Sequence, residues 1–241
     1  MKKIFAICVV AVVLAIGTSQ ATPISLGTAA NYAVLAGSTV TNTGSSVING
    51  DLGVSPGSAI TGFPPGIVNG TIHDNDAAAA LAQTDLTTAY NTLAGMAVTQ
   101  NLSGQDLGSV GTLTAGVYFF SSTAQLTGTL TLSGTGDFVF QIGSTLTTAT
   151  GSSVLLISGA DASNVYWQVG SSATLGTTTA FKGSILALTS ITLNTGATIE
   201  SGRALARNGA VTLDDNTITI PEPATLCLLG FGALSLLRRK K

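Results

Sequence analysis

The stretch Phe140-Gln141-Ile142-Gly143-Ser144 is followed by a second version of itself, Trp167-Gln168-Val169-Gly170-Ser171. Each version joins an aromatic residue and a glutamine to a β-branched residue, a glycine and a serine. Short β-branched runs separated by glycine are typical of strands and tight corners. Similar units that recur along a chain are too thin to bury a core alone, so neighbouring units must stack. Residues 141–199 are therefore predicted to form successive coils of a β-solenoid.

A shorter pattern of glycine and small hydroxyl residues recurs inside and outside this stretch. It is present in Thr150-Gly151-Ser152-Ser153, Leu175-Gly176-Thr177-Thr178 and Thr195-Gly196-Ala197-Thr198, with a fourth copy in Thr43-Gly44-Ser45-Ser46. Between the copies, leucine and threonine alternate with period two, as in residues 126–132. Such alternation predicts strands with leucine inside and threonine outside. Short strands also account for residues 24–47 and for residues from 102 onward.

One segment, residues 77–93, predicts a helix instead. Asn75 or Asp76 can cap it, a run of four alanines begins it, and Gly95 is a suitable end. Apolar side chains recur on one face at helical spacing, so the helix is expected to lie along a flank of the solenoid. The residues expected to make this contact are Leu81, Leu86, Tyr90 and Leu93.

Both ends of the chain resemble processing signals rather than parts of a domain. Residues 1–21 have a basic start, an apolar run and a small-x-small site before a cleavage expected after Ala21, as in a secretory signal peptide. Residues 221–241 begin with Pro221, Glu222 and Pro223, continue with an apolar run and end in four basic residues. Plain membrane anchors are the alternatives at both ends. Residues 22–220 are expected to form one domain.

Composition excludes several classes of function for that domain. Its bases are Lys182, Arg203 and Arg207 against ten acids, so it has no electrostatic footprint for nucleic acid. The two cysteines, Cys8 and Cys227, lie in the terminal segments, and His73 is the only histidine. A thiolate metal site, a cysteine nucleophile and a zinc site therefore lack residues, and no metal or other cofactor is expected.

A cluster of charged residues near the end of the domain leaves an enzymatic alternative open. Carboxylates and bases gathered on a β-helix serve some polysaccharide-cleaving enzymes, whereas the last coils of a solenoid also need polar capping. We favour capping and predict no catalytic residue. The residues in question are Lys182, Glu200, Arg203, Arg207, Asp214 and Asp215.

Several motifs, occurring together and in order, resemble the ice-binding-protein-like domain of bacteria and fungi. They are Asn49-Gly50-Asp51-Leu52-Gly53, Thr61-Gly62-Phe63-Pro64-Pro65-Gly66, residues 77–90, residues 125–132, Phe140-Gln141-Ile142-Gly143-Ser144 and Ala204-Leu205-Ala206-Arg207. The resemblance covers nearly all of residues 24–220. It implies a mainly β fold, an irregular β-helix of triangular section with one long α-helix packed alongside.

The same resemblance implies an exported, non-catalytic protein that binds ice or ordered water through a flat face rich in threonine and serine. Members that bind ice often carry Thr-(Ala/Gly)-x-(Thr/Asn), which Thr195-Gly196-Ala197-Thr198 matches and the other copies match in part. Low charge between residues 107 and 199 agrees with such a face. The alternative is a structural or adhesive protein of the cell surface or matrix. The residues expected to contact ice are Thr147, Thr150, Ser152, Thr174, Thr177, Thr195 and Thr198.

The C-terminal segment resembles the PEP-CTERM sorting signal of Gram-negative bacteria, through Pro221-Glu222-Pro223, the apolar run and the basic end. The resemblance implies processing by an exosortase-type membrane protease. It also implies export by the general secretory route to a secreted or cell-surface location, with a transient or permanent C-terminal membrane anchor. Extracellular polysaccharide is a further possible partner there.

Overall fold

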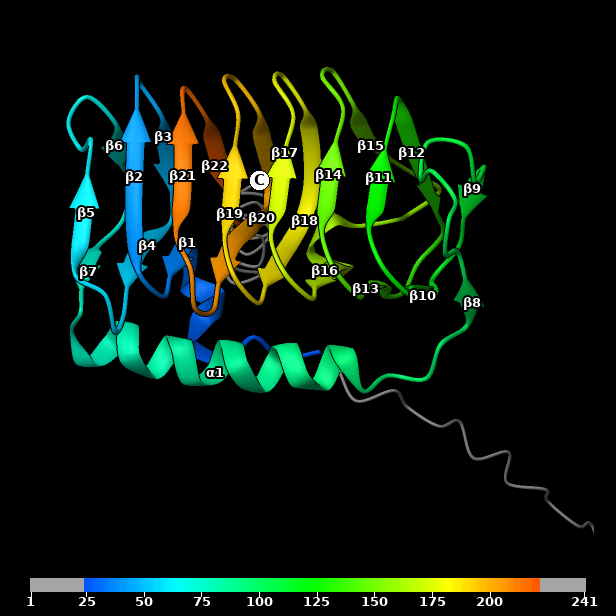
Figure 1. Ribbon diagram of the computed structural model, residues 1–241, viewed down its shortest axis with the longest axis horizontal. Helices are drawn as coiled ribbons and strands as arrows, with labels where there is room; N and C mark the ends of the chain where they lie inside the picture. The colour runs from blue at the N-terminus through cyan, green and yellow to red at the C-terminus, as the bar shows by residue number, and fades with distance from the viewer. Residues whose placement is uncertain (1–23, 222–241) are drawn as a thin grey trace, which may run out of the picture.

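The computed structural model describes residues 24–221 as a stack of parallel strand coils beside one long helix (Figure 1). The predicted signal peptide and nearly all of the predicted sorting segment lie outside the described residues. No helix in residues 24–221 is both long enough and apolar enough to span a bilayer. The strands pair in parallel throughout and form three ladders around a common core. The mainly β solenoid with a single α-helix is therefore confirmed.

The first ladder, called here the front ladder, is the seven-stranded sheet that faces the viewer in Figure 1. Its strands are short, and each except β5 contributes one or two buried residues, whereas β5 contributes the partly buried Ile60. In spatial order they are β11 (Ala124–Leu126), β14 (Leu146–Thr148), β17 (Ala173–Leu175), β19 (Ile191–Leu193), β21 (Val211–Asp214), β2 (Thr39–Thr43) and β5 (Ala59–Thr61).

The other two ladders share strands that run around a corner, and together they make the larger sheet. The second ladder holds β9 (Thr112–Leu113), β12 (Thr129–Ser133), β15 (Ser153–Ile157), the starts of β18 (Ala180–Ala187) and β20 (Thr198–Ala206), β22 (Thr217–Thr219), β3 (Val47–Asn49) and β6 (Ile67–Val68). The helix-side ladder holds β8 (Gln100–Asn101), β10 (Gly116–Phe120), β13 (Phe138–Ile142), β16 (Val165–Val169), the ends of β18 and β20, β1 (Tyr32–Ala36), β4 (Asp51–Val54) and β7 (Ile72–Asp74). Short 3-10 helices lie at Gly27–Asn31 and Ala162–Asn164.

The two copies of the repeat, at residues 140–144 and 167–171, begin with strand residues that pair in register. Phe140 lies beside Trp167, and Gln141 beside Gln168, in neighbouring strands β13 and β16. Their rings form part of a buried stack in which the Phe140 and Trp167 centroids are 4.0 Å apart and Phe181 lies 4.8 Å beyond. Such pairs add roughly 0.5–1.5 kcal/mol each beyond burial of their area. The prediction of successive coils is confirmed here.

The order of coils in space differs from their order in the chain. The N-terminal strands β2 and β5 lie at one end of the front ladder, and the chain then crosses to the other end through the helix. From there β11 to β21 return coil by coil until β21 meets β2, pairing Val211 with Val40 and Thr212 with Thr41. The last strand of the front ladder in the chain, β21, therefore lies between β19 and the N-terminal strand β2, in the middle of the stack. A repeat pattern in the sequence does not indicate this insertion.

Helix α1 (Ala77–Ala94) covers the helix-side ladder and confirms the predicted cap and end. The Asp76 side chain accepts a hydrogen bond from the Ala79 amide, and Gly95 ends the helix. Eighteen residues rise about 27 Å, close to the roughly 28–29 Å of six ladder steps, so the helix spans the stack. Leu86, Tyr90 and Leu93 are buried as predicted.

The prediction for Leu81 is wrong, since 52% of this residue is exposed. Small residues, Ala82 and Ala89, take the inner stripe beside Leu86 and bring the helix close to the sheet. Carbonyl groups at and just after the C-terminal end of the helix accept hydrogen bonds from Gln141, a residue of the strand repeat. The side-chain amide of Gln141 donates to the carbonyls of Leu93, at 2.7 Å, and Met96, at 2.9 Å.

Candidate functional site

The front ladder presents an uninterrupted column of threonines to solvent. Thr147 pairs with Thr174, Thr174 with Thr192, Thr192 with Thr212, Thr212 with Thr41 and Thr41 with Thr61. These six residues, called here the threonine column, come from six neighbouring strands. Gln125 continues the column by one more step at the β11 edge. Each member is exposed or half-buried.

Strand geometry sets the spacing of this column. Neighbouring strands are about 4.7–4.9 Å apart, and residues two apart on one strand are separated by about 6.6–6.8 Å. A second column lies two residues before the first and contains Thr123, Thr145, Ser172, Ser190, Ala210, Thr39 and Ala59. Alanine replaces the hydroxyl residue at two of its seven positions. The two columns together make a two-dimensional grid of methyl and hydroxyl groups.

Buried side chains beneath the grid hold the strands flat. Threonines at the centre of the column are flanked along their strands by inward residues, Ala173 and Leu175 around Thr174 and Ile191 and Leu193 around Thr192, all at most 1% exposed. Threonine in a strand also has a restricted χ1 angle. Backbone and side chains of the grid are therefore fixed before any ligand arrives.

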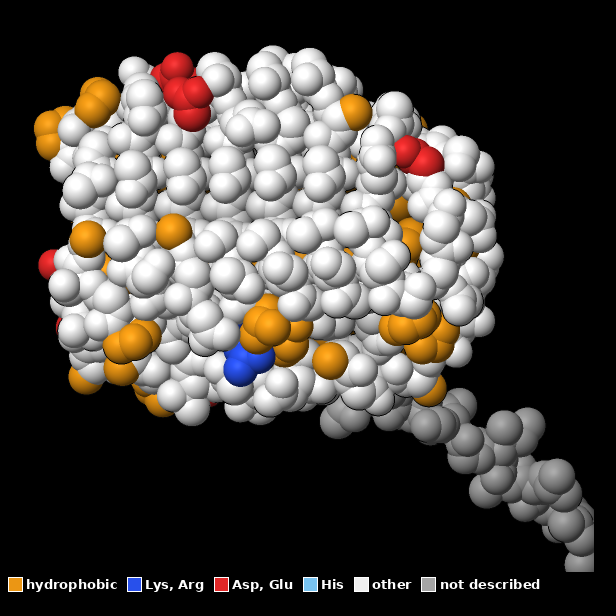
Figure 2. Space-filling model, in the orientation of Figure 1, with side chains coloured by type: hydrophobic (Ala, Val, Ile, Leu, Met, Phe, Trp, Pro, Cys, Tyr) orange, Lys and Arg blue, Asp and Glu red, His pale blue; other side chains and the backbone are white. Residues whose placement is uncertain are grey.

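The grid is uncharged. Among residues 24–221, neither column contains an ionisable side chain, and Asp214 lies at the corner where β21 ends. Figure 2, drawn from the front, shows parallel rows of polar uncharged side chains, with acidic and basic side chains only towards the margins of this face. Strongly hydrated groups are thus kept away from the centre of the grid.

The seven residues predicted to contact ice do not all lie on this face. Thr147 and Thr174 belong to the threonine column. Thr150, Thr177 and Thr195 lie at the corner that follows the front strands, where Gly151 donates to the carbonyl of Thr177 and Thr178 to that of Thr195. The Thr195 hydroxyl donates to the carboxylate of Asp214.

Thr198 and Ser152 are placed elsewhere. Thr198 belongs to the second ladder, where it pairs with Ala180 on one side and Thr217 on the other. Ser152 is 0% exposed and donates to the carbonyl of Leu126 at 3.0 Å, so its prediction as a surface residue is wrong. The glycine pattern marks a corner of the solenoid rather than a face. Gly44, Gly151 and Gly196 have φ of 77°, 70° and 71°. The chain turns inward at the next residue after Gly151 and Gly196, and one residue later, at Ser46, after Gly44.

Four members of the threonine column are missing from the prediction, namely Thr41, Thr61, Thr192 and Thr212. A signal for two of them is present in the sequence, because Ile191-Thr192-Leu193 and Val211-Thr212-Leu213 alternate as a half-buried strand does. Thr41 and Thr61 come from the N-terminal coils. Their place beside Thr212 depends on the insertion of the C-terminal strands, which alternation alone does not reveal.

The other two faces are unlike the front face. The second ladder carries the Lys182–Glu200 ion pair and the exposed side chains of Leu155 and Ile157. The helix-side ladder is covered by α1, with Leu35, Val139, Leu186 and Leu205 packed beneath the helix. Among the described residues, the front ladder is thus the face that presents two regular, uncharged columns at least partly exposed to solvent.

The charged residues considered as an enzymatic cluster are spread over three sides of the solenoid. Lys182 and Glu200 pair on the second ladder, and Asp214 lies at the front corner. Arg203 is buried on the helix-side ladder, while the guanidinium of Arg207 lies 4.6 Å from the ring centroid of Tyr90 in α1. The proposed carboxylate-and-base cluster is therefore not formed. Within residues 24–221, no three His, Cys, Asp or Glu side chains are arranged to hold a metal ion.

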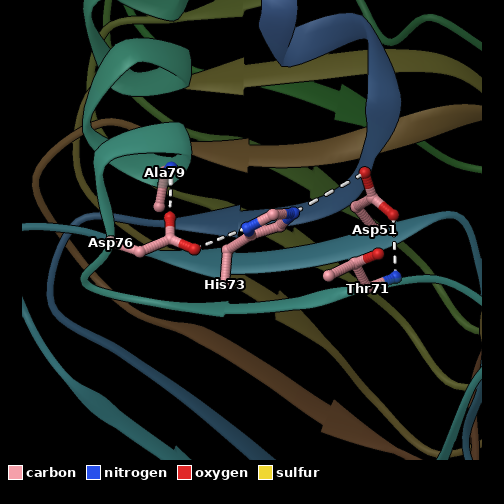
Figure 3. Close-up of polar contacts among 5 residues, drawn as sticks. All are labelled: Asp51, Thr71, His73, Asp76 and Ala79. Atoms are coloured by element: carbon pink, nitrogen blue, oxygen red, sulfur yellow. Dashed lines mark hydrogen bonds and ion pairs between the residues drawn. The ribbon is translucent and has the colours of Figure 1, made fainter.

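His73 has a structural position at the entry to the helix. Its Nδ1 atom lies 2.7 Å from Oδ2 of Asp76, and its Nε2 atom 3.9 Å from Asp51 (Figure 3). Asp76 also accepts from the Ala79 amide, and Asp51 accepts from the Thr71 amide at 2.8 Å. The imidazole thus connects β4, β7 and the first turn of α1.

Comparison with known proteins agrees with this fold. The ice-binding-like family matches residues 34–219, and the PEP-CTERM protein-sorting motif matches residues 219–241. A protein of Nostoc sp. strain HG1 described as an ice-binding protein is 59% identical over 229 residues, covering 88% of this chain and 84% of the relative. A second ice-binding protein, from Flavobacterium frigoris strain PS1, is 37% identical and covers 83% of this chain and 77% of the relative.

Solved structures agree as well. A crystal structure of an ice binding protein from an Antarctic biological consortium has a TM-score of 0.80 at 54% identity, covering 88% of this chain and 97% of that one. The ice-binding protein of the Antarctic ascomycete Antarctomyces psychrotrophicus also has a TM-score of 0.80, at 43% identity, with 84% and 100% covered. The family match extends over most of the chain and coincides with the solenoid described above. The chain belongs to the ice-binding-like family and carries a C-terminal PEP-CTERM sorting motif.

Proposed function

We propose that this protein binds ice through the front face, with the threonine column at the centre of the contact. The observation that carries the proposal is the run of six threonines in register at the centre of an uncharged grid on the front ladder. Membership of the ice-binding-like family, shared with relatives described as ice-binding proteins, supports it.

The chemistry of threonine suits an ordered water surface. The methyl group is apolar and favours an ordered cage of water around it, while the hydroxyl can donate and accept hydrogen bonds to the same waters. Repetition at strand spacing extends this arrangement over the whole grid. Because the side chains are already fixed, contact with ice costs little further conformational entropy. Binding of this kind involves no catalysis and no cofactor.

The sorting motif at residues 219–241 suggests exosortase-mediated sorting to the cell surface. We further propose that residues 1–21 are removed as a signal peptide, that residues 22–220 form the ice-binding domain, and that residues 221–241 serve as the sorting segment. Intact mass of protein from the native cell tests this division. Met1 or Lys241 in the final form would contradict removal of the corresponding end.

Extracellular polysaccharide is a second proposed partner. Sorting to the cell surface brings the domain among such polymers, and uncharged hydroxyl side chains can exchange hydrogen bonds with sugar hydroxyls. Co-sedimentation with the matrix polysaccharide of the native cell tests this proposal separately from ice binding.

Slow freezing of a dilute solution tests ice binding directly. Protein that binds ice enters the growing solid, and a single crystal grown in its presence becomes faceted. Protein that stays in the liquid fraction and leaves crystals round would contradict the proposal and favour a structural or adhesive role at the cell surface.

A further inference from the structure

A cavity of about 450 Å³ lies where the two ends of the described chain meet, on the helix side of the solenoid. Ile24 and Leu26 line it from the N-terminal end, and Ile220 and Pro221 from the C-terminal end. Two buried polar residues, Tyr166 and Arg203, complete the wall. This volume is within the range of small-molecule sites, roughly 300–1,000 Å³.

Arg203 is a buried cation without a carboxylate partner among the described residues. It is 7% exposed, and its hydrogen bonds run to neutral groups, the carbonyl of Ala30 from Nε (2.9 Å) and Nη2 (2.7 Å) and the hydroxyl of Ser184 from Nη1 (3.3 Å). Burial lowers the pKa of Arg203 to about 10. A buried charge that is not neutralised is costly, so a negative partner at this point would be stabilising.

Two N–H groups of the Arg203 guanidinium make no hydrogen bond to the described residues. Arginine carries five N–H groups, and the three contacts above leave one N–H on each terminal nitrogen, the pair that a carboxylate accepts in a bidentate manner. Tyr166 and Arg203 are both ladder neighbours of Ser184, one on each side. The Tyr166 hydroxyl makes no hydrogen bond to another residue within 24–221, although its residue is only 7% exposed. Two residues with unused donors of different kinds therefore line one cavity.

We propose that this cavity is a carboxylate-binding site, with the guanidinium of Arg203 and the hydroxyl of Tyr166 as its two donors. The site is separate from the front face, so it does not depend on ice binding. Two sources can supply the carboxylate. One is the chain itself, because Glu222 is bonded to Pro221, a residue of the cavity wall. The other is a free carboxylate from solution.

A source within the chain would have a direct consequence for sorting. Glu222 is the central residue of Pro221-Glu222-Pro223, the start of the predicted sorting segment. Its carboxylate on Arg203 would attach that tripeptide to the folded domain, because the cavity wall is made by both ends of the domain. A chain whose solenoid has not closed would lack the cavity and would leave the tripeptide unattached.

Thermal unfolding of the full-length chain in a neutral detergent tests the site and its source. The variants are Glu222→Gln, which removes the charge, and Glu200→Gln, a control that removes an exposed acid paired with Lys182 instead. Each is measured in sodium chloride and in sodium formate at equal ionic strength. We expect Glu222→Gln to lower the unfolding midpoint by about 3–12 °C, the shift that loss of one charged hydrogen bond produces in a domain of this size. Formate should restore the midpoint of Glu222→Gln and leave that of Glu200→Gln unchanged.

Two further variants connect these effects to the proposed donors. In an Arg203→Lys or a Tyr166→Phe background, both the loss caused by Glu222→Gln and its rescue by formate should shrink. Tyr166→Phe keeps the fold, since it deletes a hydroxyl without a partner among the described residues, and it serves if Arg203→Lys does not fold. If Glu222→Gln has no effect but formate stabilises the unaltered chain through Arg203, the site is supported and the ligand is a free carboxylate. If neither Glu222→Gln nor formate shifts the midpoint, the proposal is overturned.

Discussion

The imidazole Nδ1 of His73 lies 2.7 Å from Oδ2 of Asp76, while Oδ1 of the same carboxylate caps the amide of Ala79. One aspartate therefore serves two elements, the last residues of β7 and the first turn of α1. Hydrogen bonds from the Ala79 amide and from His73 lower the pKa of Asp76. Hydrogen bonds from the amide and hydroxyl of Thr28 likewise lower the pKa of Asp85, farther along the helix. Attachment of the helix to the domain is thus linked to the ionised state of two carboxylates.

Acid should therefore weaken the attachment of the helix. A carboxylate whose pKa is lowered by folding stabilises the fold above its unfolded pKa of about 3.9, and this contribution is lost as the pH falls through the folded value. We expect the unfolding midpoint to fall as the pH drops below about 4. Burial raises the pKa of Asp137, which acts in the opposite sense, so the decrease reflects the balance. Circular dichroism melts across this range measure it.

The cap itself is tested by Asp76→Ala and Asp76→Asn. Alanine removes the acceptor for the Ala79 amide, whereas asparagine keeps an acceptor oxygen and loses the charge. We expect Asp76→Ala to lower the unfolding midpoint more than Asp76→Asn, and both variants to depend less on pH than the unaltered protein. Equal midpoints for the two variants and the parent would show that the cap contributes nothing.

Docking of α1 is tested by the same substitution at two positions of one helix. Leu86 is 0% exposed and Leu81 is 52% exposed. Leu86→Asp places an unpaired charge in the contact between helix and sheet and should cost roughly 3–5 kcal/mol in unfolding free energy. Leu81→Asp should stay within about 0.5 kcal/mol. Denaturant titration separates the two outcomes, and similar costs at both positions would rule out the docking described here.

The centre of the front face is tested by Thr192→Tyr. Thr192 lies between Thr174 and Thr212 in the column, so a large side chain there holds the flat grid away from an ice surface. We expect crystal faceting and uptake into ice to be lost, with unfolding free energy changed by about 0.5 kcal/mol or less. Thr217→Tyr is the matched control, because Thr217 is an exposed threonine on the second ladder. Loss of faceting in the control and not in Thr192→Tyr would assign binding to the other face.

Thr195 and Thr198 allow a finer distinction, since the motif Thr195-Gly196-Ala197-Thr198 spans a corner. Thr198→Tyr projects from the second ladder and is expected to leave faceting intact. Thr195→Tyr lies at the margin of the front face, beside Asp214, and should weaken faceting without abolishing it. Ice-crystal shape measured as a function of protein concentration distinguishes a partial loss of faceting from a complete loss.

These placements show which features of the structure can be predicted from the sequence and which cannot. The repeat at Phe140-Gln141 and Trp167-Gln168 predicted stacked coils, and the pairing is in register. The cap at Asp76 and the end at Gly95 predicted the helix to within one residue. In both cases the signal is local, a side chain or glycine that acts on its immediate neighbours.

The candidate face was predicted only in part, for a geometric reason. Alternation with period two separates inside from outside, but a three-sided solenoid has three outsides. Of the residues predicted to contact ice, Thr147 and Thr174 lie on the front ladder, whereas Thr198 lies on the second ladder because a corner separates it from Thr195. Corner lengths vary between coils, so the distance from a glycine does not fix the face. The pairing of Thr41 with Thr212 joins opposite ends of the chain, and no local pattern carries that information.

The pairing of β21 with β2 also has a consequence in time. The N-terminal coils are synthesised and exported first. The edge of β2 that pairs with β21 therefore stays unpaired until almost the entire polypeptide has emerged. An open strand edge is a template for pairing with another chain, and contacts of such long range form slowly. A molecule truncated before Val211 would keep that edge and have a threonine column broken in the middle. Completion of the binding surface and removal of its aggregation hazard are thus the same late event.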